Sequence, residues 1–172
     1  MSQIHCLLMR RDLTAPLAAP QWPAGITVYN YSPEHAQAVH QLMHLGYQDG
    51  GGDVPVLDSW RQAFESDAEY DPELCLVARD AEGVIGVAQC WTSAYIKDLV
   101  VHPRVRGQGL GCALLQQAFI LFAERREGCV DLRVLEGNLG ARRLYERVGM
   151  YIVRHETCLL YTSDAADDTP CV

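Results

Sequence analysis

A chain of 172 residues can form one domain with a substantial core, and its 49% hydrophobic and 21% charged residues are typical of a soluble globular protein. Acidic residues outnumber basic ones by 22 to 14, and the formal net charge of −8 argues against nucleic acid as the main partner. No apolar run reaches the roughly 20 residues that span a membrane. Arg10, Arg11 and Asp12 come too early for the apolar part of a signal peptide. We therefore expect a cytoplasmic protein with neither a membrane nor a nucleic-acid partner.

Hydrophobic periodicity and turn signals divide the chain into short strands and helices. In chain order they predict strands at residues 3–10 and 26–31, helices at 33–46 and 57–68, strands at 74–79, 84–91 and 95–102, a helix at 110–127, a strand at 130–135, a helix at 138–148 and a strand at 151–161. Ser32 and Pro33 mark the start of the first helix, as an N-cap followed by proline at the first helical position.

The organisation of the chain follows from its proline, glycine and acidic segments. Residues 1–25 are expected to be an N-terminal strand and a connector with three prolines, and residues 26–162 are expected to be a single domain. Residues 47–55 contain Gly50–Gly52 and predict a flexible loop that would suit a lid. Residues 163–172 form an acidic tail without periodicity, which adds nothing to a core and could be foreign to the natural protein.

The order of the elements indicates the fold class. Tight turns join the strands between residues 74 and 102, so these strands are antiparallel. Strand 95–102, helix 110–127 and strand 130–135 form a crossover, which requires a parallel pair and is right-handed by rule. The sequence therefore predicts an α/β fold with a mixed, mostly antiparallel sheet, one parallel crossover and helices on both faces.

The seven cysteines give no sign of disulfides or of a metal site. Their number is odd, they include no Cys-x-x-Cys pair, and no His-x-x-x-His lies nearby. Reduced cysteines that pack as small apolar residues are the better interpretation.

The most informative segment is Arg-Gly-Gln-Gly-Leu-Gly at residues 106–111, between a predicted strand and a predicted helix. Glycines let the backbone come close to an anion, and the start of a helix offers N–H groups and a positive dipole. Arg104 and Arg106 add positive charge in an acidic chain. This turn predicts a site for a phosphate or pyrophosphate.

Two common phosphate-binding folds fit this segment poorly. A dinucleotide-binding fold also has a strand, a glycine loop and a helix, and Glu136 even closes the following strand. However, Gly107, Gly109 and Cys112 satisfy Gly-x-Gly-x-x-Gly/Ala poorly, and only one parallel crossover surrounds the motif. No Gly-Lys-Ser/Thr follows the glycines, which excludes a P-loop.

Residues 100–111 instead resemble the acyl-CoA site of the GNAT superfamily of N-acetyltransferases. That family's pattern, Arg/Gln-x-x-Gly-x-Gly/Ala, is met by Arg106, Gly109 and Gly111. Residues 138–150 resemble the family's later helix, Asn-x-x-Ala-x-x-x-Tyr-x-x-x-Gly-Phe, with Met150 in place of the aromatic residue. The two motifs occur in the family's order, and the resemblance covers residues 26–161.

The resemblance implies an acetyl-CoA-dependent N-acetyltransferase that works by direct transfer in a ternary complex. It implies that the pantetheine arm lies along a strand like an added strand, and that the N–H of Val100 polarises the thioester carbonyl. The expected contacts are Leu99, Val100 and Val101 for the pantetheine arm, and Arg106, Gly107, Gln108, Gly109, Leu110 and Gly111 for the pyrophosphate.

Two residues of the second motif receive roles from the same resemblance. Tyr145 is the expected general acid and sulfur contact, since a phenol can pass its proton to a departing thiolate. The alternative is a core tyrosine that packs with Leu144 and Val148. Asn138 is expected to bind the pantetheine or a nearby backbone group, and its alternative is an N-cap.

The general base is the least determined role. An alkylammonium must lose a proton before it attacks, and some relatives use a carboxylate on the strand before the glycine loop. Asp98 is the best candidate there, because Lys97 cannot accept a proton while it is charged. Asp53, Glu73 and a water relay are alternatives, and His102 is more consistent with a strand end than with a base.

The acceptor should bind near the early helices, where acidic residues are frequent. These residues are Asp49, Asp53, Asp58, Glu65, Asp67, Glu69, Asp71 and Glu73. They predict a small, positively charged amine such as a polyamine or an aminoglycoside, although a solvated acidic surface would have the same composition. Alternatives are a peptide or protein amine, or a module that binds acyl-CoA without turnover. A homodimer in which strand 3–10 pairs with a partner subunit is a further expectation.

Overall fold

The computed structural model describes residues 3–47 and 53–159 of the chain. The elements in this part are β1 (Gln3–Asp12), β2 (Thr27–Asn30), α1 (Ala36–Gly46), α2 (Leu57–Glu65), β3 (Cys75–Asp80), β4 (Gly83–Trp91), β5 (Tyr95–Val101), α3 (Leu110–Glu124), β6 (Cys129–Leu135), α4 (Leu139–Arg147) and β7 (Tyr151–Leu159). Single 3₁₀ turns precede α1, β3 and α3, at Pro33–His35, Pro72–Leu74 and Pro103–Val105. None of the helices in the described ranges is long and apolar enough to cross a membrane.

Within the described residues, the strands form one seven-stranded sheet in the order β2-β3-β4-β5-β6-β1-β7. The β5–β6 pair is parallel and the other neighbouring pairs are antiparallel. Helix α3 connects the two parallel strands, as a crossover must. The predicted mixed α/β fold with one parallel crossover is therefore confirmed.

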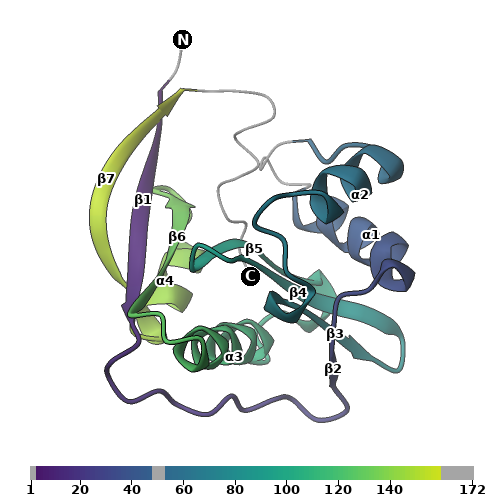
Figure 1. The fold of residues 1–172 in the computed structure, drawn as a ribbon, viewed down its shortest axis with the longest axis horizontal. Coiled ribbons are helices and arrows are strands. Elements are labelled where there is room, and N and C mark those ends of the chain that lie inside the picture. Colours follow the sequence, from purple (N-terminus) through teal and green to yellow (C-terminus); the bar gives the residue numbers. More distant parts are fainter. Residues whose placement is uncertain (1–2, 48–52, 160–172) are drawn as a thin grey trace.

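The N-terminal strand β1 occupies an interior place in this sheet. It pairs with β6 on one edge and with β7 on the other, and Leu7 and Met9 are fully buried. Figure 1 shows the connector after β1 crossing the molecule to reach β2 at the opposite edge of the sheet. Because both edges of β1 are paired within the chain, this strand cannot add to the sheet of a partner subunit, which corrects the expectation for residues 3–10.

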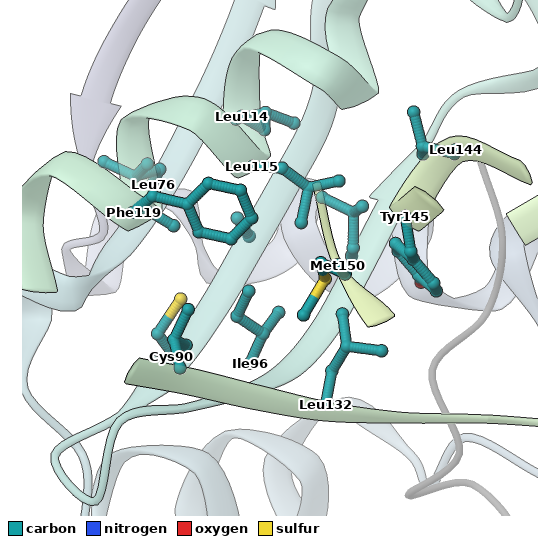
Figure 2. Packing of buried hydrophobic residues seen from close by; sticks show 14 of the residues in the cluster. Leu76, Cys90, Ile96, Leu114, Leu115, Phe119, Leu132, Leu144, Tyr145 and Met150 are labelled. Carbon is teal, nitrogen blue, oxygen red and sulfur yellow. The ribbon is translucent and has the colours of Figure 1, made fainter. Parts of the chain in front are cut away.

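The sheet separates two apolar clusters. On one face, α3 and α4 cover the larger cluster, and Figure 2 shows Leu114, Leu115 and Phe119 of α3 packed above Cys90, Ile96 and Leu132 of the sheet. On the other face, α1 and α2 pack against β3, β4 and β5 (Figure 1). Burial of each large apolar side chain contributes about 1.5–3 kcal/mol, so these two clusters hold the helices on their faces.

Strands β5 and β6 separate soon after they meet. Their parallel ladder has one registered pair in the described structure, Tyr95 with Asp131, and the N–H of Asp131 donates to the carbonyl of Ala94 at 3.1 Å. Among the described residues, Ile96 to Val101 of β5 pair with β4 and with no other strand. The edge of β5 that faces β6 is therefore available to pair with another extended chain.

Candidate active site

The glycine turn before α3 is shaped for an anion. Gly107 and Gly109 have φ angles of +79° and +90°, which favour glycine, and Gly109 is the N-cap of α3. The first helical hydrogen bond runs from the N–H of Ala113 to the carbonyl of Gly109 at 3.0 Å. The N–H groups of Leu110, Gly111 and Cys112 therefore have no acceptor within the helix. A cavity at this point is lined by Val101, Val105, Gly107, Gly109, Leu110, Gly111, Cys112, Gly140, Leu144 and Arg147.

The two arginines of the turn have different partners. Arg104 forms ion pairs with Asp80 at 2.7 Å and Glu82 at 3.1 Å, at the turn between β3 and β4. Arg106 is exposed, and its Nε donates to the carbonyl of Val101 at 3.3 Å, next to the glycine turn. Of the two, Arg106 is the one that stays beside the anion cavity, as the proposed pyrophosphate contact requires.

The pairing of β5 determines which of its backbone groups face the gap beside β6. The N–H of His102 donates to the carbonyl of Ile85, which directs the polar groups of His102 toward β4. Alternation in an antiparallel ladder gives Val100 the same direction and turns Leu99 and Val101 toward the gap. Arg106 binds the Val101 carbonyl from that side. The backbone N–H that could donate to a thioester carbonyl in this gap is therefore that of Leu99, whereas the N–H of Val100, the expected donor, faces β4.

A β-bulge in β5 brings two adjacent charged residues to one face. The registered pairs are Gln89 with Asp98 and Cys90 with Ile96, so Lys97 is the extra residue. Ile96 and Leu99 both belong to the cluster beneath α3, although a regular strand would turn them to opposite faces. Between them, Lys97 and Asp98 both line a cavity on the face covered by α1 and α2.

This second cavity has a volume of about 240 Å³ and mixed chemistry. Aromatic and other apolar side chains form most of its wall, and charged groups lie at several points around it. The residues used below are Tyr47, Asp53, Trp60, Phe64, Asp67, Trp91, Lys97 and Asp98.

A buried hydrogen bond fixes the carboxylate of this cavity. Asp98 and Tyr47 are each 7% exposed, and the Tyr47 hydroxyl donates to Oδ1 of Asp98. Tyr47 follows the end of α1, where Gly46 approaches β5 so closely that a Cβ would lie 2.5 Å from Cγ1 of Val100. No local sequence signal marks Tyr47, because only the packing of α1 on β5 brings it to Asp98.

Residues 36–150 match the family model described as "Acetyltransferase (GNAT) family". The chain belongs to the GNAT acetyltransferase family. It is 28% identical to a mycothiol acetyltransferase of Thermobispora bispora over 82% of this chain and 52% of that protein. It is 31% identical to one of Salinispora tropica over 82% of this chain and 50% of that protein. The chain thus spans about half the length of these relatives.

Solved structures agree with this assignment. The GCN5-related N-acetyltransferase from Sphaerobacter thermophilus superposes with a TM-score of 0.78 at 28% identity, over 90% of this chain and 50% of that one. The GNAT family is a family of acetyltransferases, and the family as a whole uses acetyl-CoA. The gap beside β5 and the anion cavity next to it fit an extended pantetheine arm that ends in a pyrophosphate.

The residues considered as the general base lie at different places in the structure. Asp98 and Asp53 line the second cavity, whereas the carboxylate of Glu73 binds Arg125 at 3.2 Å, near the end of α3. Nδ1 of His102 accepts the N–H of Arg104 and caps the 3₁₀ turn, in agreement with its reading as a strand-end residue. Asp98 is the buried member of the pair in the cavity, and Asp53 is exposed.

Several of the acidic residues between residues 49 and 73 already have partners. Arg125 binds Asp71 at 2.8 Å; burial would raise the pKa of Asp71, but this hydrogen bond lowers it overall. Glu65 accepts from Tyr31 and Arg61. Asp67 and Asp53 line the cavity, and Asp49 lies outside the described residues, as does the Gly50–Gly52 segment. The acidic character of the second cavity therefore comes from fewer residues than the sequence predicted.

Helix α4 carries the second motif beside the anion cavity. Tyr145 is completely buried in the larger apolar cluster with Leu144, and Figure 2 shows both at one end of that cluster. Oδ1 of Asn138 accepts the N–H of Ala141 at 3.3 Å, so Asn138 is the N-cap of α4. Tyr145 thus packs as a core tyrosine and Asn138 serves as an N-cap. The roles of both residues toward acetyl-CoA stay predictions.

Two buried cysteines lie close to Asp98 without being suited to accept an acyl group. Burial, and then the charge of Asp98, raises the pKa of the Cys90 thiol to about 12. Burial also raises the pKa of Cys75 well above its ordinary value. At neutral pH both thiols are protonated and are poor nucleophiles.

Proposed function

We propose that this chain transfers an acetyl group from acetyl-CoA directly to the primary amine of a small molecule bound between α1, α2 and β5. The observation that carries this proposal is the sequence of groups along β5. Asp98, held by Tyr47, faces the acceptor cavity, and the next residue, Leu99, turns its N–H toward the gap beside β6. A proton acceptor and a carbonyl-polarising donor thus lie on adjacent residues.

Each chemical step then has a group on this chain. Asp98 accepts a proton from the bound ammonium, and the free amine attacks the thioester carbon. The N–H of Leu99 donates to the carbonyl oxygen as negative charge develops there, and one such donor is typically worth about 3 kcal/mol of barrier. The carbon–sulfur bond breaks as the carbon–nitrogen bond forms, and Tyr145 passes its proton to the departing sulfur.

Two observations favour particular amines as acceptors: the negative charge of the cavity and the names of the related proteins. Asp53, Asp67 and Asp98 favour an acceptor that enters as a cation, which supports the small-amine reading. The relatives named mycothiol acetyltransferase make the deacetylated form of mycothiol a second candidate acceptor. Polyamines and aminoglycosides remain candidate acceptors beside it.

The test is release of CoA from acetyl-CoA in the presence of polyamines, aminoglycosides, peptide N-termini and deacetylated mycothiol. We expect at least one small amine to raise release above the hydrolysis background. The Tyr145→Phe variant should lose turnover while it keeps its affinity for CoA. A chain that binds CoA but acetylates none of these amines would be a binding module, and that result would overturn the proposal.

A further inference from the structure

We propose that Lys97 is a site of self-acetylation: when no amine occupies the acceptor cavity, this chain transfers the acetyl group of bound acetyl-CoA to Nζ of its own Lys97. This inference rests on the proposed function, because it uses the same base, the same N–H donor and the same acid. It goes beyond that function because it assigns a covalent modification to a residue of the chain itself.

The first support is the distribution of basic residues. Of the 14 basic residues in the sequence, 13 are arginines and one is a lysine, Lys97. The guanidinium of arginine stays protonated in proteins, whereas the ammonium of lysine can lose a proton and become a nucleophile. The only primary amine on a side chain of this sequence therefore lies on β5, the strand that carries the proposed base.

The second support is the position of Lys97 in the β-bulge of β5. A regular strand would turn Lys97 and Asp98 to opposite faces, but the bulge places both in the wall of the acceptor cavity. Asp98 is the next residue along the strand, and Leu99, the proposed donor to the thioester carbonyl, follows it. The Lys97 amine thus belongs to the cavity from which an acceptor amine would attack.

The surroundings of Lys97 keep its amine in this wall and suit the acetylated product. Nζ of Lys97 lies 5.5 Å from the centre of the Trp91 ring, and Trp91 lines the same cavity and stacks on Tyr95. A cation is attracted to an aromatic face, so this contact positions the side chain. Acetylation removes the positive charge. The neutral amide that results is compatible with a wall that also contains Trp60 and Phe64.

The transfer to Lys97 is balanced with the groups of the proposed mechanism. Asp98 accepts a proton from the Lys97 ammonium, and the free amine attacks the thioester carbon. The carbon–nitrogen bond forms and the carbon–sulfur bond breaks. The nitrogen gives up its second proton to solvent as the amide forms, and Tyr145 donates a proton to the departing sulfur and recovers one from solvent. The products are CoA and an Nε-acetyl group on Lys97.

Intact-mass spectrometry of the purified chain, incubated with acetyl-CoA and no added amine, tests this inference. We expect one acetyl group per chain, and peptide mapping should locate it on Lys97. The rate constant should saturate with acetyl-CoA, because the reacting thioester is bound, and it should not depend on protein concentration, because the reaction is intramolecular. An added amine that the chain acetylates should slow the modification, since both amines need the same cavity.

Variants separate self-acetylation from the slow direct reaction of lysine with acetyl-CoA in solution. Arg154→Lys is the matched control, because position 154 is exposed on β7. In this variant Lys97 should be acetylated at least about a hundredfold faster than the introduced side chain, because the fold holds Lys97 in the same site as the thioester. Asp98→Asn should slow the modification of Lys97 by on the order of a hundredfold. Thermal unfolding and CoA binding check that each variant is folded.

Three results would overturn the inference. These are an unmodified Lys97 in a chain that acetylates an added amine, equal rates at positions 97 and 154, and equal modification of Lys97 in the wild-type and Asp98→Asn chains. Acetylation of an added amine by the same preparation shows in each case that the proposed function stands. If the chain acetylates neither Lys97 nor any added amine, the proposed function fails instead.

Discussion

In the proposed mechanism, Asp98 is the single side chain on which the chemistry depends most. Replacing it by asparagine keeps the shape and removes the proton acceptor, so acetylation at neutral pH should fall by about 10²- to 10⁴-fold. The defect should shrink as the pH rises toward the amine's own pKa, about 10 for an alkylamine, because the fraction of free base grows. The measurement is kcat/KM against pH, and Asp58→Asn, an exposed carboxylate of α2, is the matched control. A loss that does not vary with pH would contradict this role.

The buried thiols near Asp98 give a second prediction about individual side chains. Burial and the charge of Asp98 raise the pKa of Cys90 from 9.0 to about 12, so its reactive thiolate is scarce in the folded protein at pH 8. Alkylation of Cys90 by iodoacetamide should be slower than in the unfolded chain by on the order of a thousandfold. Peptide mapping after labelling measures this rate, and the partly exposed Cys112 is the internal control.

The raised pKa of Cys90 also makes the stability of the protein depend on pH. A folded-state pKa above the unfolded value means that the stabilising effect is complete below about pH 9 and is lost as the pH rises toward 12. The free energy of unfolding should therefore decline in that alkaline range. Rapid labelling of Cys90 in the native protein at pH 8 would show that its environment is more open than the structure indicates.

Among the structural elements, the turn into α3 combines backbone shape with ligand binding. Gly109 has a φ of +90°, and alanine in a left-handed conformation costs roughly 1–2 kcal/mol. Gly109→Ala should weaken CoA binding at least about tenfold, since Gly109 lines the anion cavity and its strained backbone would displace the N–H groups at the start of α3. Gly25 has a φ of +78° and open space around it, far from the site in the chain. Gly25→Ala should lose similar stability and keep its CoA affinity; equal effects on binding would contradict the prediction.

The contact between α1 and β5 gives another prediction for an element. A Cβ on Gly46 would lie 2.5 Å from Cγ1 of Val100, so Gly46→Ala should destabilise the protein by about 1–3 kcal/mol and displace Tyr47 from Asp98. Val100→Ala removes the opposing methyl groups and should rescue part of this loss in the double variant. Gly128→Ala, where a Cβ meets nothing within 4 Å, should change stability by less than about 0.5 kcal/mol. Strictly additive losses in denaturant titrations would argue against the close contact.

These elements also show what a sequence can and cannot reveal. Helix α3 and its glycine turn have local signals, namely the glycine spacing and the apolar period, and both lie where expected. The bulge at Lys97 and the contact of Tyr47 with Asp98 depend on how β5 pairs with β4 and on where α1 packs. Tyr47 and Asp98 are 51 residues apart, and no local pattern encodes their meeting. The acceptor cavity could therefore be placed near the early helices but not assembled residue by residue.

The complete sheet raises the question of whether its two halves unfold together. Strands β2 to β5 and strands β6, β1 and β7 are joined by one registered parallel pair in the described structure. The cluster beneath α3 nevertheless contains residues of both halves, including Leu7 of β1 and Ile85 of β4. Arg10 of β1 also binds Asp131 of β6 at 2.7 and 2.9 Å, close to the single parallel pair. Shared apolar packing, rather than strand pairing, should make unfolding cooperative across the sheet.

This cooperativity can be tested from opposite ends of the sheet. Leu7 is fully buried in β1, so Leu7→Ala should lower the free energy of unfolding by about 2–5 kcal/mol. The three tryptophans, Trp22, Trp60 and Trp91, lie in the connector after β1, in α2 and in β4, away from the substitution along the chain. Their fluorescence should nevertheless report the full shift and coincide with the transition seen by far-UV circular dichroism. His5→Ala, on an exposed position of the same strand, should leave both unchanged. Two separate transitions, with fluorescence insensitive to Leu7→Ala, would mean that the β6–β1–β7 half unfolds on its own.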